Sequence, residues 1–266
     1  MRAHSVTTYP LLQSVVSIND DGLIADAAVM DGGATLAFES SGEFFGDVFT
    51  LSAPGDGFTN VDLIVGNSWC YCEEAIMGGD DNKWMQLDFL PKPATSALSW
   101  TTYGFWNAYD SNLKTTTDAA FVTGYITPTG SVPITGSATY SGSVVGKVYV
   151  ADSSQPSGIT AYGLSGNASL NANFGNRSIA GNLTNMSANS QPWNSISLLG
   201  TISGGNFTGT TTATSAPEGF ASLSGSATGT FAGLFFGPKA EELGAVWSLY
   251  DGSKSALGAI GAKTGP

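Results

Sequence analysis

The residues best suited to bind a metal lie in one acidic stretch of the first half of the chain. Asp80-Asp81-Asn82 follows closely after Glu73 and Glu74, and hard oxygen donors of this kind are the ligands that calcium prefers. Their order does not match the ligand spacing of a known calcium loop, which favours a plain acidic turn. The sequence therefore predicts no metal site.

Two cysteines, Cys70 and Cys72, are separated by Tyr71 alone. Zinc sites usually place two residues between paired cysteines and add a second pair or histidines elsewhere. Here the one histidine is His4, near the N-terminus. A tight disulfide and two free thiols are both compatible with this spacing. Zinc chemistry, a Cys-His nucleophile pair and bis-histidine haem ligation are poorly supported.

The sequence also lacks the motifs of common catalytic sites. No Gly-x-Ser-x-Gly elbow precedes a helix, and the Ser, His and acidic residues form no triad context. No glycine-rich phosphate loop opens a helix either. We therefore predict a protein that is not an enzyme and that holds no cofactor.

Aromatic side chains are the strongest candidates for a functional site, because such residues dominate the energetics of many binding surfaces. They gather between residues 69 and 106, where Phe105 belongs to the same group. The candidate ligand-binding residues are Trp69, Tyr71, Trp84, Trp100, Tyr103 and Trp106. The alternative is that they form the core of a β domain, since β cores use the same residue types.

Charge is distributed unevenly along the chain. Residues 1–130 hold 16 acidic and four basic residues, which gives −12, whereas residues 131–266 hold five of each sign. The change coincides with the turn-forming stretch Pro128 to Pro133. We therefore expect two domains, an acidic β-rich domain over 1–130 and a second domain over 131–266. Nucleic acid is excluded as a partner, because phosphate binding needs a basic face.

Composition predicts an all-β protein. Charged residues make up 11% of the chain and hydrophobic residues 42%, with abundant Gly, Ser, Thr and Asn. No apolar run is long enough for a transmembrane helix. Residues 1–20 also lack the pattern of a signal peptide, so either this numbering starts after a removed signal or export uses another route.

Apolar residues alternate with polar ones along most of the chain, which predicts strands. In the first half we expect strands within 11–18, 34–39, 43–51, 60–65, 84–90, 98–106 and 121–126. The stretch 98–106 carries aromatic side chains on both faces, so both faces are buried or one is offered to a ligand.

The second half repeats short strands separated by Gly, Ser or Asn turns. The expected strands are 137–150, 158–174, 177–184, 194–203, 206–214, 222–236, 245–250 and 256–262. Eight sequential strands suit a closed antiparallel up-and-down barrel, which has no open edge. The predicted barrel core is Ile159, Leu164, Leu170, Phe174, Ile179, Leu183, Ile196, Leu198, Ile202, Phe207, Phe231 and Trp247.

The stretch 229–249 is expected to form the closing hairpin of this barrel, with Phe231 and Trp247 inside and Glu242 on a solvated turn. Its motif Phe236-Gly237-Pro238-Lys239-Ala240-Glu241-Glu242-Leu243-Gly244 resembles the closing hairpin of the transferrin-binding protein B barrel, which also occurs in hemophilin-like, Slam-exported bacterial proteins. Ala245 stands where that family usually has a second glycine. A second marker, the segment 136–142, resembles the opening strand of the same barrel.

This resemblance implies a handle-like N-terminal domain followed by a barrel, and a binding protein that is secreted or displayed on the outer surface of a Gram-negative bacterium. It also implies nutrient acquisition, with a protein partner or a small hydrophobic ligand such as haem. Haem itself is poorly supported, because only His4 offers an imidazole and the alternative axial ligands are Tyr or Met side chains such as Tyr71 or Met77. The alternative is a structural subunit of a cell-surface assembly that associates with copies of itself or with another complex.

Overall fold

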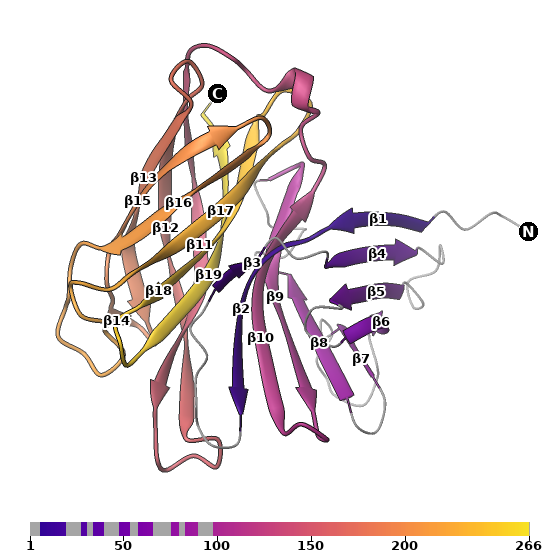
Figure 1. Ribbon diagram of the computed structural model, residues 1–266, viewed down its shortest axis with the longest axis vertical. Coiled ribbons are helices and arrows are strands. Elements are labelled where there is room, and N and C mark those ends of the chain that lie inside the picture. The colour runs from indigo at the N-terminus through magenta and orange to yellow at the C-terminus, as the bar shows by residue number, and fades with distance from the viewer. Residues whose placement is uncertain are drawn as a thin grey trace, which may run out of the picture.

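The computed structural model consists of two antiparallel β units that lie side by side, and the chain passes from one to the other only once (Figure 1). It describes residues 6–19, 28–30, 34–39, 48–53, 58–65, 76–79, 83–89 and 98–265. The N-terminal unit is a ten-stranded sheet, and the C-terminal unit is an eight-stranded barrel. The all-β fold with a C-terminal antiparallel barrel is therefore confirmed.

The barrel uses strands that follow one another in the chain, and it closes because β12 pairs with both β11 and β13. All eight expected strands are present, and a two-residue strand, β14 (Gln191–Pro192), is added beside β13. The eight are β11 (Ser137–Ala151), β12 (Ile159–Asn173), β13 (Ser178–Ala188), β15 (Ile196–Ser203), β16 (Asn206–Ala213), β17 (Thr228–Phe236), β18 (Glu242–Tyr250) and β19 (Ser255–Thr264).

Large apolar side chains fill the inside of the barrel. Every residue of the predicted core is buried, and all of them except Ile159 belong to the cluster inside the barrel. Phe231 and Trp247 lie directly opposite each other on β17 and β18, as expected for the closing hairpin. Ala245 also points into this cluster, so its methyl group takes a core position. The barrel interior is therefore a packed core.

The N-terminal sheet has the strand order β1-β4-β5-β6-β7-β8-β9-β10-β2-β3. Its strands are β1 (Val6–Pro10), β2 (Leu12–Asn19), β3 (Ala28–Met30), β4 (Thr35–Glu39), β5 (Val48–Ala53), β6 (Phe58–Val65), β7 (Ile76–Gly79), β8 (Lys83–Phe89), β9 (Thr101–Asp110) and β10 (Thr115–Gly124). Only Leu11 separates β1, at one edge, from β2, near the other edge. The sheet therefore curls back on itself around its own apolar cluster.

The sequence-based strands of this unit are mostly found, with two kinds of difference. The strands β1, β3 and β7 were not expected. β3 and β7 have three and four residues, which show too little alternation to be recognised, whereas β1 is as long as the expected β4. Strand β10 begins at Thr115, six residues before the expected start at Phe121, because it pairs with β9 along its whole length.

A third apolar cluster joins the two units, and we call this contact the seam. It combines Tyr103, Phe105 and Val122 of the sheet with residues of β17, β18 and β19 of the barrel. Strands β18 and β19 are buried on both faces, because one face lines the barrel and the other contacts the sheet. At Gly261 a Cβ would collide with the ring of Tyr103, so this glycine allows the close approach.

The connection between the units, residues 125–136, is hydrogen-bonded to the barrel at Thr127 and exposed in the segment that follows. The backbone N–H of Thr127 donates to the carbonyl of Phe235, and its hydroxyl donates to the carbonyl of Gly237 at 2.7 Å. A short 3₁₀ helix, η2 (Thr129–Ser131), follows and is exposed. The proposed boundary between 1–130 and 131–266 falls in this helix and stays a prediction. The described residues include no helix with the length and hydrophobicity to cross a bilayer.

Candidate binding surface

The six aromatic residues singled out from the sequence occupy very different environments. Trp69 and Tyr71 lie outside the described residues. Trp84 and Trp100 are exposed, with 42% and 41% of their surface accessible. Tyr103 and Trp106 are buried. The alternative of core packing therefore applies to Tyr103 and Trp106. Of the four candidates that the structure describes, Trp84 and Trp100 are the two that present a surface to a partner.

Successive residues of β9 point to opposite faces, which explains why both buried aromatics are inside the molecule. Tyr103 and Phe105 face the seam, whereas Trp106 points into the core of the N-terminal sheet and donates its indole N–H to the side-chain oxygen of Gln13 at 3.2 Å. Burial raises the pKa of the Tyr103 hydroxyl, and a hydrogen bond with Ser143 partly opposes that rise. Both faces of β9 are thus covered by protein.

Trp100 forms an exposed aromatic pair with Tyr125. Their ring centroids are 5.7 Å apart, and 50% of the surface of Tyr125 is accessible. The N–H of Tyr125 donates to the carbonyl of Trp100 at 2.9 Å, so the two backbones are held together. Gly124, with φ of +147°, makes this possible, because a Cβ there would collide with the carbonyl oxygen of Trp100. The indole ring also lies against Gly237, beside Pro238 of the closing hairpin.

Glu242 fixes the backbone on which Trp100 is carried. Its carboxylate accepts the N–H groups of Ser99, Trp100 and Thr101 at 2.6, 2.9 and 2.9 Å. Only 3% of the Glu242 surface is accessible. The expectation that Glu242 lies on a solvated turn is therefore wrong: the residue starts β18, and the N-terminal unit covers it. Three consecutive amides satisfy the buried charge, which is the condition for burying a carboxylate.

Trp84 forms a second aromatic pair, with the half-buried Tyr109 on the N-terminal sheet. Its ring centroid lies 6.5 Å from that of Tyr109, and the two residues are directly opposite on β8 and β9. Cross-strand aromatic pairs stabilise a sheet, so this pair has a structural role whether or not it binds a partner. Among the described residues, no hydrogen bond or ring pair connects Trp84 to Trp100 or Tyr125.

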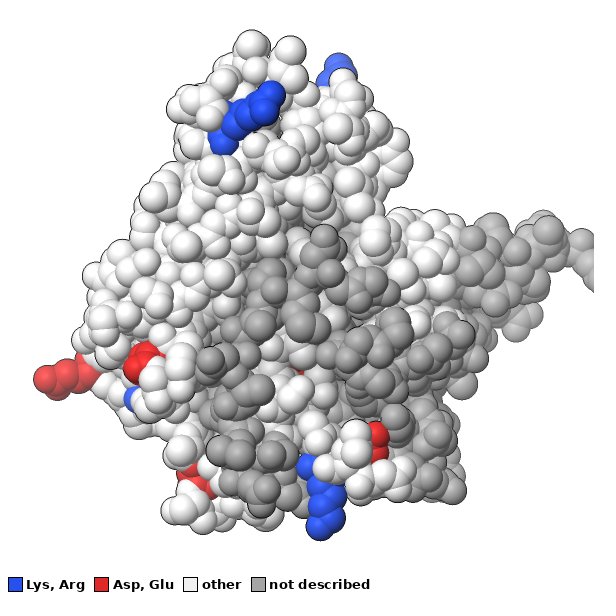
Figure 2. All heavy atoms as spheres, in the orientation of Figure 1, with Lys and Arg blue, Asp and Glu red and all other residues white. Residues whose placement is uncertain are grey.

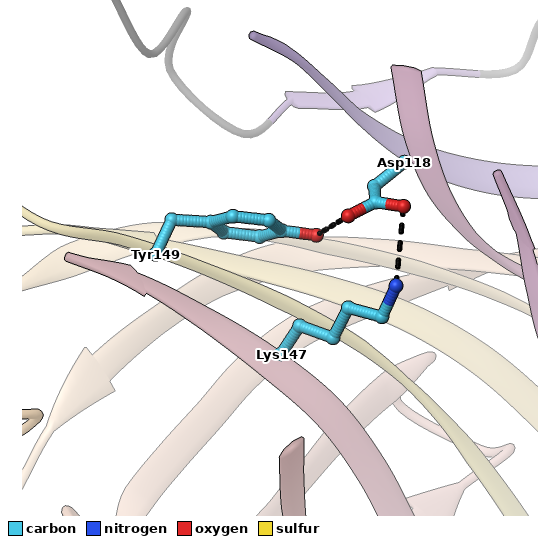
Figure 3. Close-up of polar contacts among 3 residues, drawn as sticks. All are labelled: Asp118, Lys147 and Tyr149. Atoms are coloured by element: carbon cyan, nitrogen blue, oxygen red, sulfur yellow. Dashed lines mark hydrogen bonds and ion pairs between the residues drawn. The ribbon is translucent and has the colours of Figure 1, made fainter. Parts of the chain in front are cut away.

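A polar contact crosses the seam between β10 and β11 (Figure 3). Asp118 of β10 accepts the Tyr149 hydroxyl at 2.9 Å and pairs with the Lys147 ammonium at 3.1 Å, both from β11. The ammonium also lies 5.3 Å from the centre of the Phe105 ring. Burial raises the pKa of Tyr149 well above its ordinary value, and the Asp118 carboxylate adds to the rise. This contact orients the sheet on the barrel.

Among the residues that Figure 2 colours white, red or blue, Lys, Arg, Asp and Glu are few on the face shown. Among the described residues no group of His, Cys, Asp and Glu could hold a metal ion. The residues considered for calcium and zinc, Asp80-Asp81-Asn82, Glu73, Glu74, Cys70, Cys72 and His4, lie outside the described ranges. The described surface is therefore suited to binding by shape, aromatic contact and hydrogen bonding.

Sequence reasoning missed Tyr125 and Glu242. Tyr125 was read as part of the strand that enters the linker, although its place directly after Gly124 marks a break in strand geometry. Glu242 follows a Gly-Pro turn and carries a charge, and both features usually indicate a solvent-exposed side chain. Nothing near it in the sequence shows the segment 99–101 that covers it.

Comparison with known proteins points to one family. The family model described as "C-lobe and N-lobe beta barrels of Tf-binding protein B" matches residues 132–264. A search of curated proteins finds no match.

Solved structures of transferrin-binding protein B share the fold. A variant from Actinobacillus pleuropneumoniae H49 is 18% identical, with a TM-score of 0.50, and the match covers 96% of this chain and 100% of that chain. A variant from Haemophilus parasuis Hp5 is 14% identical, with a TM-score of 0.50 and coverage of 98% and 76%. The protein from Neisseria meningitidis is 15% identical, with a TM-score of 0.50 and coverage of 96% and 44%.

Proposed function

The chain belongs to the family of transferrin-binding protein B β-barrels, and from this we propose that it is a non-enzymatic binding protein that captures an iron-carrying protein. We place it on the outer surface of a Gram-negative bacterium or in the medium around one. The resemblance read from the closing hairpin supports the same family. The related structures come from proteins named for binding transferrin, and an iron carrier is therefore the partner class to test first.

The exposed pair Trp100 and Tyr125 carries this proposal. Clustered aromatic side chains that are exposed in the free protein become the energetic centre of many protein interfaces. This pair is also held rigid before any partner arrives, because Glu242 fixes the backbone of Trp100 and Gly237 supports its ring. A preorganised surface loses little conformational entropy on binding, which increases affinity.

A protein partner fits this surface better than a small molecule. The barrel interior of residues 137–264 is filled by aromatic and aliphatic side chains, and the aromatic pair lies on the outside. The net charge of −12, which comes from residues 1–130, favours a partner with a basic surface and predicts binding that weakens as salt is raised.

The proposal is tested with the full-length chain immobilised on a sensor. Iron-loaded and iron-free transferrins from several mammals are passed over it, with lactoferrin as a second iron carrier. We expect one carrier to bind, and Trp100→Ala and Tyr125→Ala each to weaken that binding about tenfold or more. Leu199→Ala, an exposed apolar residue on β15, is the matched control and should bind as the parent does.

Two results would contradict the proposal. If no iron carrier binds, the ligand class is wrong. If a carrier binds equally well to Trp100→Ala, Tyr125→Ala and the control, the aromatic pair is not the site. Size measurement of the untreated protein in the same buffer tests the alternative of a structural subunit, which predicts self-assembly in the absence of any carrier.

A further inference from the structure

The end of the barrel farthest from Trp100 carries a separate hollow. The hairpin turn beside Trp100 and the loop between β16 and β17 (214–227) lie at opposite ends of β17, so the two surfaces are separated by the length of that strand. The hollow has a volume of about 430 Å³, in the range of roughly 300–1,000 Å³ that is usual for small-ligand sites. Its walls come from the 214–227 loop and from the turn between β13 and β14.

The loop that forms one wall is rigid although it has no regular strand. Asn194 is fully buried, and its side-chain amide donates to the carbonyls of Ser215 and Leu223 at 2.5 and 2.9 Å. Its carbonyl oxygen accepts the N–H of Leu223 at 2.9 Å. The indole N–H of Trp193 donates to the carbonyl of Ala221 at 2.9 Å. Buried side chains thus hold the loop backbone from below.

This loop presents an aromatic ring to solvent. Phe220 has 54% of its surface accessible, and its ring packs edge-on against Tyr162 with centroids 4.7 Å apart. The carbonyl of the nearby Ser222 accepts the Lys254 ammonium at 2.6 Å, which ties the loop to the neighbouring turn. An exposed aromatic ring on an immobilised backbone is a preformed contact for an apolar surface of a ligand.

The polar residues around Phe220 restrict the chemistry of that ligand. Glu218 supplies acceptors only, whereas Asn189 and Gln191 supply amide donors as well as acceptors. An anionic ligand would be repelled by the Glu218 carboxylate, and a simple cation would use the carboxylate but none of the amide N–H donors. A purely apolar ligand would displace water from these three exposed polar side chains without replacing its hydrogen bonds.

We propose that this hollow binds a neutral oligosaccharide. A sugar ring offers hydroxyl groups that both donate and accept, and its C–H face is apolar. It therefore uses the carboxylate of Glu218, the two amides and the ring of Phe220 together. The main chain at Asn189 and Ser190 has positive φ values of 46° and 65°, which turns the chain sharply and brings Gln191 to the hollow. This site does not depend on capture of an iron carrier at Trp100.

The test uses the full-length chain on an array of neutral and charged oligosaccharides, with tri-lysine as a cationic probe. The neutral sugar that binds is then titrated by calorimetry. Phe220→Ala should weaken its binding about tenfold or more. Glu218→Gln, which keeps the shape but removes the charge, should weaken it by a smaller factor. Trp100→Ala and Leu199→Ala, which are remote from the hollow, should leave the affinity unchanged.

Both test residues are exposed, so the variants should unfold at the same temperature as the parent, and a loss of binding then reports on the site itself. Binding of no sugar on the array would overturn the proposal, as would binding of tri-lysine alone. A sugar that binds equally to the parent and to Phe220→Ala would show that it binds elsewhere. Trp100→Ala is a control for sugar binding and a test variant for the iron carrier. The two proposals can therefore be confirmed or contradicted independently of each other.

Discussion

The carboxylate of Glu242 accepts the backbone N–H of Thr101 at 2.9 Å, although 141 positions separate the two residues in the sequence. Glu242 begins the second strand of the barrel's closing hairpin, and Thr101 begins the strand of the N-terminal sheet that faces it across the seam. The same carboxylate binds the two preceding amides, so one side chain joins the family motif of the barrel to the segment that carries Trp100.

Replacing Glu242 with Ala should therefore destabilise the protein clearly. The variant removes the acceptor of three backbone N–H groups, of which that of Thr101 is buried, and an unsatisfied buried donor costs about 1–3 kcal/mol. We expect the free energy of unfolding to fall by at least about 2 kcal/mol, measured by denaturant unfolding. Glu218→Ala removes an exposed carboxylate and is the control. Equal unfolding free energies for the two variants would show that the three hydrogen bonds do not stabilise the seam.

Trp247→Ala should destabilise the barrel from inside. Trp247 is fully buried, lies opposite Phe231 in the strand register and packs with its ring centroid 6.3 Å from that of Trp193. Removing a buried ring of this size costs about 3–5 kcal/mol, a large part of the roughly 5–15 kcal/mol that stabilises a domain. Thermal unfolding of this variant should be compared with that of Leu199→Ala, whose side chain is exposed. A melting temperature equal to that of the control would place Trp247 outside the stabilising core.

The barrel could be predicted from the sequence because its strands are long and follow one another. Alternation over eight or more residues shows which side chains face inward, so Leu170, Phe207 and Trp247 were assigned to the core correctly. Each strand pairs with the next in the chain, and the order of the strands needed no further information. The strands β3 and β7, of three and four residues, are too short for this signal.

The seam could not be predicted, because its partners are distant in the sequence. Tyr103 and Trp106 showed that β9 has aromatic residues on both faces, but not that the barrel covers the face of Tyr103. Gly261 is one of 35 glycines, and its role depends on the Tyr103 ring that fills the space where a Cβ would lie. Glu242 was expected in solvent because the segment 99–101 that covers it is also distant in the sequence.

Stability should fall as the pH rises above about 10, the ordinary pKa of tyrosine. The folded-state pKa of Tyr149 is raised by burial and by Asp118, and burial also raises those of Tyr140 and Tyr103. The unfolded chain then releases protons that the folded protein retains, so each step up in pH favours unfolding. Denaturant unfolding at several pH values between 8 and 11 measures the slope.

Tyr149→Phe should flatten that slope. The variant loses the hydrogen bond to Asp118, and we expect it to be less stable than the parent at neutral pH by about 1 kcal/mol. Its stability should then fall less steeply above pH 10, because the variant lacks the Tyr149 hydroxyl, whose proton the folded parent retains and the unfolded parent releases. Tyr250→Phe, at an exposed position, is the control. A slope unchanged in Tyr149→Phe would mean that Tyr149 does not contribute to alkaline unfolding.

Haem should not bind tightly to this protein. Haem needs an axial ligand, and the described methionines Met85 and Met186 are buried in the two cores. The sequence offers a single imidazole, that of His4, and the side chains of His4, Tyr71 and Met77 lie outside the described set. Addition of haemin should therefore give no sharp Soret band at one equivalent, measured by visible absorption. A stoichiometric complex would contradict this prediction, and Tyr71→Phe and Met77→Leu would then identify the ligand.

Limited proteolysis should cut the chain at the exposed helix η2, within residues 127–132, and leave a stable C-terminal fragment. Thr127 is buried and hydrogen-bonded, so we expect the cut on its C-terminal side, after Pro128. The two fragments should separate on a denaturing gel but elute together from a sizing column, because the apolar seam, Glu242 and the Asp118–Lys147 pair hold them together. Co-elution that persists in mild denaturant and is lost on Glu242→Ala would support this role of the seam. Degradation of the second half to small peptides would mean that the barrel does not fold independently, and that the division at residue 130 is not a domain boundary.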